Sequence, residues 1–322
     1  MTAGIDPGCV RLGLRVVQGR IGDVHVASER PSVALTLRGR QADVAVRLVP
    51  LLFALCGKAQ GRAAALALQA ARGTERLPHL DPAIQHEVLR EHLWRWLLDL
   101  PPLLGEAAMR DEFVAATRWM ARGERGELCA LLAGRQIVAL RRRLLAAPDA
   151  SDPEARLLPV LDAKTSLDAW PRLDADFCRL PKWQGAAAET GAVARRPSRD
   201  GPRVPAFATR WLARLGELHD WASGSEEIGA GGTASAAQVA PGRGRALVET
   251  ARGLLMHELV LDGDRVADYF IVAPTEWNFH PQGPLAGWLA GRDASDRDAL
   301  QTFAARAVAA LDPCVRWELE WL

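Results

Sequence analysis

The spacing of apolar residues changes along the chain from short alternating runs to the steps of amphipathic helices. Two runs rich in β-branched residues, 9–17 and 21–27, flank a Gln-Gly-Arg turn sequence at residues 18–20, which predicts two strands joined in a hairpin. From residue 41 to about residue 147, apolar residues recur at helical spacing. We therefore expect a small N-terminal sheet followed by a group of helices.

The clearest helix signal begins at Asp81, a preferred N-cap residue, with Pro82 at the first helical position. Apolar residues from Ile84 to Leu100 then recur mostly every three or four positions and form one face. The two prolines at 101–102 predict the end of this helix, because proline has no backbone N–H to donate. Further helices are expected over residues 106–121, 126–146, 207–221 and 294–311.

Two stretches have the character of loops, residues 184–205 and residues 222–245. The second is rich in Gly, Ala and Ser with few large apolar residues, and we predict both to be flexible. Residues 254–261 and 266–273 are strand-like and are joined by Asp-Gly-Asp, a strong hairpin signal. The chain shows no internal repeat, and we expect a single domain over residues 1–322.

Composition limits the class of protein and its partners. The chain has 322 residues, of which 49% are hydrophobic and 25% charged, as is typical of a globular protein with a sizeable core. Forty basic residues against thirty-nine acidic ones leave a formal net charge of +1. This balance gives no general attraction for nucleic acid or for an anionic membrane, so neither is expected as a partner.

Compartment and redox state can also be inferred. The longest apolar runs, 48–57 and 63–71, are shorter than the roughly 20 residues that cross a bilayer. Residues 1–8 lack the basic and apolar parts of a secretory signal, which predicts a cytoplasmic protein without a transmembrane helix. Five cysteines, an odd number, argue against a disulfide framework. A cysteine with a function is then expected to act as a thiolate.

Three possible motifs fail on spacing or context. His86 and His92 lie too far apart for the zinc-protease motif, whose histidines are four residues apart, so a solvated helix face is favoured. The glycines at 229–232 lack a preceding strand and a following Gly-Lys-Ser/Thr, so a linker is favoured over a phosphate loop. Cys129 and Cys178 have no cysteine or histidine at ligand spacing, which predicts buried structural thiols.

Two cysteines stand in short segments near opposite ends of the chain. Cys56 lies in Leu-Cys-Gly, and Cys314 follows Asp-Pro. By pattern alone each is a lone cysteine, which favours packing over metal binding. Between them, residues 251–257 read Ala-Arg-Gly-Leu-Leu-Met-His and residues 274–278 read Pro-Thr-Glu-Trp-Asn.

Taken in order, these four segments resemble the large subunit of [NiFe]-hydrogenases. That family carries R-x-C-G-x-C-x-x-x-H near its start, then A-P-R-G-x-x-x-H, then P-T-T-W-N, and D-P-C-x-x-C-x-x-H at its mature end. The resemblance covers both ends of the chain well and its middle poorly. The matching residues are Cys56-Gly57, Arg252-Gly253 with His257, residues 274–278, and Asp312-Pro313-Cys314.

The departures from the hydrogenase pattern are as informative as the matches. In that family four thiolates hold nickel, and two of them bridge to iron. Here Ala59 and Trp317 stand at the two bridging positions, so a four-sulfur nickel site cannot be built. Ala63 and Glu320 replace the histidines that close the two cysteine motifs, and Arg11 aligns with a proton-transferring glutamate of the family.

A hydrogenase-like chain that keeps the first cysteine of each pair and loses the second resembles the HupK/HoxV family of hydrogenase maturation proteins. The resemblance implies a non-enzymatic assembly scaffold that transiently carries an Fe(CN)2(CO) unit, without nickel. It implies maturation proteins of the HypC/HypD type and the hydrogenase large-subunit precursor as partners. Soft thiolates suit low-spin iron, and two of them leave room for three diatomic ligands.

The same resemblance assigns roles to four residues. Cys56 and Cys314 would be the iron ligands, and Arg252 and Thr275 would donate hydrogen bonds to cyanide nitrogen. Because each iron–sulfur bond is about 2.3 Å long, the two sulfur atoms should lie within roughly 4 Å of each other. Plainer interpretations stay open, namely Arg252 as an arginine ion-paired near Glu249 and Thr275 as a turn residue.

The fold expected from the resemblance is α+β and predominantly α-helical. It is a truncated hydrogenase large subunit with small N-terminal strands and a C-terminal β-hairpin near the site. One alternative function is a cofactor-free chaperone that binds maturation partners while the two cysteines merely pack. An active hydrogenase is disfavoured by Ala59 and Trp317 at the bridging positions.

Overall fold

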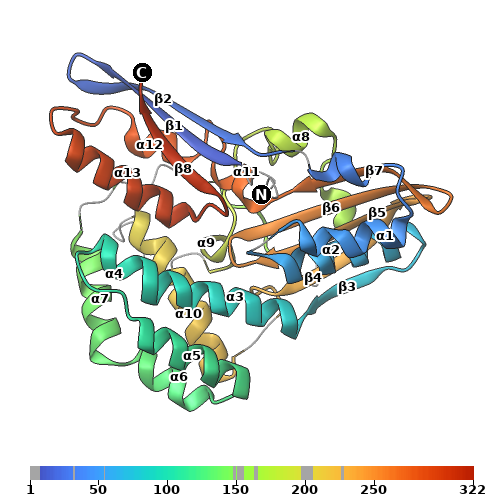
Figure 1. The fold of residues 1–322 in the computed structure, drawn as a ribbon, viewed down its shortest axis with the longest axis horizontal. Helices are drawn as coiled ribbons and strands as arrows, with labels where there is room; N and C mark the ends of the chain where they lie inside the picture. The colour runs from blue at the N-terminus through green and yellow to red at the C-terminus, as the bar shows by residue number, and fades with distance from the viewer. Residues whose placement is uncertain are drawn as a thin grey trace, which may run out of the picture.

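The computed structural model describes residues 8–31, 33–53, 55–147, 150, 156–162, 166–196, 206–225 and 228–322. Helices account for 48% of the chain and strands for 24%. The strands form two separate sheets, and most of the helices gather beside them (Figure 1). The expected α+β, predominantly helical fold class is therefore confirmed.

The smaller sheet joins the two ends of the described chain. Strand β1 (Cys9–Val17) pairs antiparallel with β2 (Arg20–Glu29) and parallel with β8 (Arg316–Trp321) (Figure 1). Gln18 and Gly19 have φ of 51° and 75°, the positive values that a two-residue hairpin turn requires. The predicted N-terminal hairpin is confirmed, whereas β8 has no counterpart among the predicted strands.

The larger sheet is antiparallel and has five strands in the order β3-β4-β5-β6-β7. Its last two strands confirm the hairpin predicted around the Asp-Gly-Asp turn. The bounds are Arg76–Leu80 for β3, Thr233–Ala240 for β4, Arg243–Thr250 for β5, Gly253–Asp262 for β6 and Arg265–Val272 for β7.

The loop prediction for residues 222–245 is wrong, because most of this segment is ordered structure. It holds the last residues of α10, all of β4 and the start of β5. Ala234 and Ala236 of β4 are buried, so these small residues serve packing within the sheet. In the other predicted loop, 184–205, the structure contains the short helix α9 (Ala192–Arg195), and residues 197–205 lie outside the described part.

Helix α2 (Gly57–Ala71) lies across the larger sheet and packs against β4, β5 and β6 (Figure 1). The buried face of α2 consists mostly of alanine and leucine, and Gly244 of β5 lies directly beneath it. A Cβ atom on Gly244 would stand 2.1 Å from the carbonyl oxygen of Ala67. Only glycine therefore permits the helix to approach this closely.

Helix α3 (Pro82–Trp94) begins as predicted and continues further than predicted. The Asp81 side chain accepts hydrogen bonds from two backbone N–H groups of the first turn, at 3.0 and 3.4 Å. The chain then makes a π-helical turn over Arg95–Asp99 and enters α4 (Leu100–Leu103). The two prolines lie within this continuous helical path, which ends at Leu103, so the helix stops just beyond the predicted position.

Helix α10 (Ala206–Ser223) is central to the helical part and confirms the helix predicted over residues 207–221. It packs against α3, α6 (Arg125–Leu132), α7 (Arg135–Ala146) and α13 (Arg297–Leu311). The single helix expected over 126–146 is thus two helices. They are separated at Gly134, whose extended backbone at ψ 155° interrupts the helical path.

The remaining elements are short, apart from α5 (Arg110–Arg122). They are η1 (Val33–Leu37), α1 (Ala42–Leu48), η2 (Val49–Leu51), η4 (Leu167–Ala169), α8 (Ala175–Arg179), α11 (Pro274–Asn278) and α12 (Pro284–Leu289).

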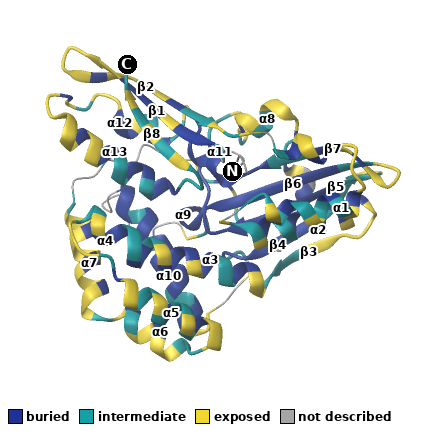
Figure 2. Ribbon diagram, viewed as in Figure 1, coloured by how far each residue is buried: buried dark blue, intermediate teal, exposed yellow. Residues whose placement is uncertain are grey.

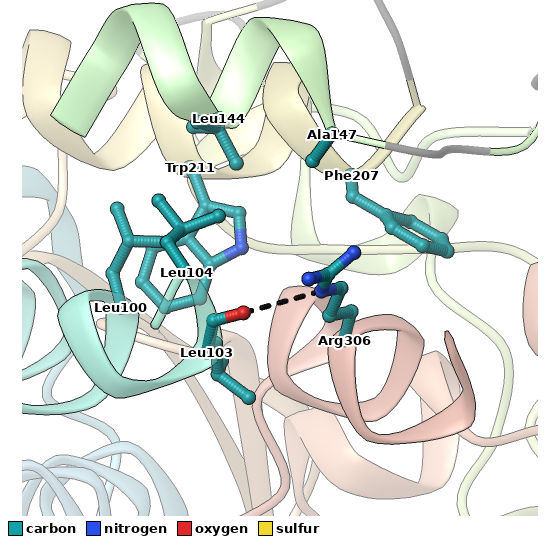
Figure 3. Close-up of a pocket in the computed structure, with 8 residues that line it drawn as sticks. All are labelled: Leu100, Leu103, Leu104, Leu144, Ala147, Phe207, Trp211 and Arg306. Atoms are coloured by element: carbon teal, nitrogen blue, oxygen red, sulfur yellow. Dashed lines mark hydrogen bonds between the residues drawn. The ribbon is translucent and has the colours of Figure 1, made fainter. Parts of the chain in front are cut away.

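Burial is extensive where α2 covers the larger sheet and where α10 packs among the other helices, and the outer faces of α5, α6 and α7 are exposed (Figure 2). A small apolar pocket lies between α4, α7, α10 and α13 (Figure 3). Its volume of about 20 Å³ suits roughly one water molecule, and it contains no cysteine. The lining residues are Leu100, Leu103, Leu104, Leu144, Ala147, Phe207, Trp211 and Arg306.

Among the described residues, no helix combines the length and the apolar character needed to cross a membrane.

Candidate functional site

Cys56 occupies the N-cap position of α2, and its side chain makes no capping hydrogen bond. The carboxylate of Glu87, on α3, instead accepts hydrogen bonds from the backbone N–H groups of Lys58 and Ala59, at 2.9 and 3.1 Å. These N–H groups lie in the first turn of α2 and have no partner within their own helix. Because Glu87 satisfies them, the sulfur atom of Cys56 is left to interact with other groups.

Cys314 lies between the end of α13 and the start of β8. Thr275, in the first turn of α11 and 1% exposed, places its hydroxyl oxygen 3.1 Å from the Cys314 sulfur. The same oxygen accepts a hydrogen bond from the Cys314 backbone N–H at 3.4 Å. Thr275 is therefore part of a helix and not of an open turn, and it contacts a candidate ligand directly.

The two cysteines influence each other electrostatically. Burial raises the pKa of the Cys56 thiol to about 12, the charge of Cys314 acts in the same direction, and Arg252 opposes them. Burial would lower the pKa of Arg252, but neighbouring acids and both thiols hold it above its ordinary value.

The structure thus brings Cys56, Cys314, Arg252 and Thr275 to one place. The expected sulfur–sulfur distance of roughly 4 Å stays a prediction.

Arg252 lies in the turn between β5 and β6 and is 5% exposed. Its Nη2 atom donates to Glu91 Oε2 at 2.9 Å, and its Nε atom lies 3.4 Å from Asp312 Oδ1. The ion pair near Glu249 that the sequence left open is not formed, because Glu249 pairs with Arg195 at 2.9 Å. Arg252 Nε makes no hydrogen bond within the described residues, so this buried donor can serve a bound acceptor.

Asp312 anchors the segment that carries Cys314. It is 2% exposed, and it ends α13 in the left-handed conformation with φ of 57°. Its Oδ1 atom lies 2.7 Å from Arg95 Nη2. Burial opposes ionisation of this carboxyl, but Arg252, Arg95 and Arg214 hold the pKa of Asp312 well below its usual range. A charged, buried carboxylate therefore fixes the chain two residues before the cysteine.

Arg30 is a site residue that no sequence motif indicates. It follows β2, its side chain is 16% exposed, and its Nη1 atom donates to Glu276 Oε1 at 3.1 Å. Burial opposes the charge of Arg30, but Glu276, Cys314 and Cys56 raise its pKa. The first residue of β1 pairs with both the last residue of β2 and the first residue of β8. Only this long-range pairing brings Arg30 to the cysteines, so no local pattern could have revealed it.

Comparison with known proteins identifies relatives over nearly the whole chain, although no protein-family model matches it. The chain is 34% identical to the hydrogenase expression/formation protein HoxV of Cupriavidus necator, over 92% of each chain. It is 30% identical to the hydrogenase expression/formation protein HupK of Rhizobium leguminosarum bv. viciae, over 99% of this chain and 98% of HupK. The chain belongs to the HoxV/HupK family of hydrogenase expression/formation proteins. HupK of Bradyrhizobium diazoefficiens is 32% identical over 94% of this chain and 93% of its own length.

Solved structures show which fold this HoxV/HupK family member shares. A [NiFeSe] hydrogenase variant from Desulfovibrio vulgaris Hildenborough superposes with a TM-score of 0.63, over 93% of this chain and 94% of that chain, at 15% identity. The Ni-Fe-Se hydrogenase from Desulfomicrobium baculatum gives 0.58, over 94% and 95%, at 14% identity. At this identity the likeness concerns the fold alone. The expected hydrogenase large-subunit-like fold is confirmed.

The positions that depart from the hydrogenase motif are filled by residues that pack. Ala59 is fully buried in α2, and Trp317 is partly buried in β8, opposite Val10 of β1. Asn278 links neighbouring segments, since its side chain contacts the backbone of Thr190 at 2.9 Å and that of Arg252 at 3.1 Å. Within the described residues of this HoxV/HupK protein, no group of three or more His, Cys, Asp or Glu side chains could hold a metal ion.

Two sequence-based expectations for other residues are wrong. His92 is fully buried and lies 2.7 Å from Glu217 Oε2, so the helix carrying it has no fully solvated polar face. Its burial follows from the packing of α3 against α10, which covers this side of the helix. Cys129 is exposed and Cys178 only partly buried, because α6 and α8 lie at the surface (Figure 2). Neither cysteine is a buried structural thiol.

Proposed function

We propose that this HoxV/HupK family protein is a non-catalytic scaffold in hydrogenase maturation that transiently carries an Fe(CN)2(CO) unit. In this proposal Cys56 and Cys314 bind the iron as thiolates. The observation that supports it is that Cys56 and Cys314, from opposite ends of the chain, both lie near Arg30 and Arg252, whose charges act on both thiols. Soft sulfur ligands suit low-spin iron.

The charge of the site matches such a cargo. Two thiolates and two cyanides around a ferrous ion make a dianionic group, which guanidinium groups bind well because they do not lose their proton. Arg252 would donate to a cyanide nitrogen through the Nε atom that makes no hydrogen bond within the described residues. Thr275 has one hydroxyl proton, which it gives either to the Cys314 sulfur or to a cyanide ligand.

Loading must release protons. Burial and Cys314 raise the pKa of Cys56 to about 12, so the empty site holds Cys56 as a thiol at neutral pH. Iron binding would displace this proton, and the cost of doing so weakens retention of the cargo. The free energy needed to deprotonate the thiols lowers the net affinity of the site for iron. A scaffold must release its iron unit to another protein, and this lower affinity suits that transfer.

The proposed partners follow from the family resemblance. Maturation proteins of the HypC/HypD type would supply the iron unit, and the hydrogenase large-subunit precursor would receive it. The alternative is a cofactor-free chaperone that binds the same partners. One observation favours it, namely that the raised pKa of Cys56 keeps the unloaded thiol unreactive at neutral pH.

Infrared spectroscopy tests the proposal. The protein is purified anaerobically from a host with an intact hydrogenase maturation pathway, as wild type and as Cys56→Ala and Cys314→Ala. Cys178→Ala is the matched control, because Cys178 is also partly buried but lies outside the site, on α8. Cyanide and carbonyl bands are expected in the wild type and in the control, and they are expected to vanish in both site variants.

Two other outcomes are equally decisive. Bands that persist in both site variants would show that Cys56 and Cys314 are not the ligands. Absence of bands from the wild type, together with normal capture of maturation partners by all four proteins, would favour the chaperone.

A further inference from the structure

A line of buried polar side chains runs from the larger sheet to Cys56. The Tyr269 hydroxyl, in β7, lies 2.8 Å from Nδ1 of His257, in β6. His257 Nε2 lies 2.8 Å from Oε1 of Gln60, in the first turn of α2. The Gln60 Nε2 atom then donates to the sulfur of Cys56 at 3.8 Å. The line thus connects two strands to the helix that carries the candidate ligand.

The direction of each hydrogen bond in this line is fixed by chemistry. Gln60, His257 and Tyr269 are 1%, 0% and 2% exposed. Burial lowers the pKa of His257 to about 3, so its ring is neutral and carries one N–H. Because Gln60 Oε1 can only accept, the single ring proton is on Nε2, and Nδ1 therefore accepts from the Tyr269 hydroxyl, whose pKa burial raises. The ring proton is donated to Gln60 Oε1, which turns the Gln60 amide N–H toward Cys56.

We propose that Tyr269, His257 and Gln60 are positioning residues that hold a hydrogen-bond donor on the Cys56 sulfur and thereby reduce its electron donation to bound iron. This inference rests on the proposed function, because it concerns the same cysteine. Hydrogen bonds to a ligating sulfur are one of the ways in which a protein tunes an iron site. The donor also favours the thiolate form of Cys56 and so partly offsets its burial.

The surroundings of these residues support a role beyond packing. The buried face of α2 is otherwise made of alanine and leucine, and Gln60 is its one buried polar residue. Tyr269 is the single tyrosine of the whole chain. A buried polar side chain costs free energy unless it is hydrogen-bonded, and apolar residues would pack the same space without that cost. The line is complete only because its last donor ends on Cys56.

The first test uses the iron-free protein, in wild type, Gln60→Leu and Tyr269→Phe. Gln85→Leu is the matched control, because Gln85 is a glutamine of α3 that is also buried, at 7% exposed. The rate of Cys56 alkylation by iodoacetamide is measured at pH 8 by peptide mass spectrometry. Loss of the donor should lower the thiolate fraction about fivefold, and the greater nucleophilicity of a more basic sulfur offsets part of this. Alkylation about twofold slower is expected for Gln60→Leu, a smaller effect for Tyr269→Phe, and none for the control.

The second test uses the same proteins after anaerobic loading in a host with the maturation pathway. A thiolate that loses its hydrogen bond donates more electron density to iron, so the carbonyl band should move to lower wavenumber. The shift is expected to be larger in Gln60→Leu than in Tyr269→Phe, and absent in Gln85→Leu. A merely structural role would change the amount of loaded protein without moving the band.

The possible failures are distinguishable. Unchanged alkylation and unchanged bands, in variants that load normally, would overturn the positioning role and leave the scaffold proposal intact. Absence of bands from the wild type would overturn the proposed function and the effect on iron, while slower alkylation would still support the hydrogen bond to Cys56. Should Gln60→Leu fail to fold, as judged by its melting temperature, the isosteric Tyr269→Phe decides.

Discussion

Asp312→Asn should destabilise the protein by about 3–5 kcal/mol, the usual effect of removing one partner from a buried ion pair. The carboxylate is 2% exposed and lies 2.7 Å from Arg95, and Arg252 and Arg214 also act on it. Asparagine has nearly the same shape and tolerates the positive φ of 57° at this position. The substitution therefore removes the charge with little other change and leaves the arginines without this compensating anion.

Thermal unfolding measures the effect. For a large domain, 1 kcal/mol corresponds to a shift of about 2 °C in melting temperature, so a decrease of roughly 6–10 °C is expected at pH 7. The control is Asp268→Asn, since the Arg38–Asp268 pair is partly exposed and such pairs contribute about 0–1 kcal/mol.

The pH dependence gives an independent check of the reasoning. The folded pKa of Asp312 is lowered, so its contribution to stability is fully present above the unfolded value of about 3.9 and is lost as pH falls through the folded value. The gap in melting temperature between wild type and Asp312→Asn should be constant from pH 6 to 8 and should narrow below about pH 4. A variant that melts within 2 °C of the wild type at pH 7 would refute the buried-charge argument.

Three further substitutions probe the site and its frame. Glu87→Gln should lower the free energy of unfolding by about 1 kcal/mol, because the cap on α2 is weaker. The Glu87 charge raises the pKa of Cys56, so the same substitution should speed Cys56 alkylation. Slower alkylation would contradict this. Thr275→Val should slow alkylation of Cys314 about twofold through loss of the hydroxyl contact, and Thr275→Ser should not. Gly253→Ala should lower the melting temperature markedly, because φ is 129° and the added Cβ would meet neighbouring atoms at 2.3 Å; an unchanged melting temperature would exclude strain there.

Local signals predicted those parts of the fold that depend on neighbours in sequence. The Asp-Gly turn predicts the β6–β7 hairpin, and the Asp81-Pro82 pair predicts the start of α3. The central strands β4 and β5 escaped prediction because alanine and glycine, the signs of a flexible linker, are needed where α2 lies close to the sheet. Gly244 shows this, since any side chain there would collide with α2. Composition alone cannot distinguish these two uses of small residues.

The candidate site was predictable to the extent that motifs carry it. Cys56, Cys314, Arg252 and Thr275 were found through the family resemblance, and the structure gathers them in one place. Arg30 was missed, because its position depends on a strand pairing between the two ends of the chain. The contact of Thr275 with sulfur was also missed, since a motif identifies a residue but not the atom toward which its hydroxyl points.

The parallel pairing of β8 with β1 also sets the order in which the molecule can be completed. Strand β1 can pair with β2 as soon as residues 9–29 have been made, whereas its other edge stays open until β8 has left the ribosome. A chain ending at Val315 would contain every candidate ligand and every arginine of the site, yet it would lack the strand that holds Cys314 in place. The two-cysteine site is therefore closed only once β8 has been made and has paired with β1.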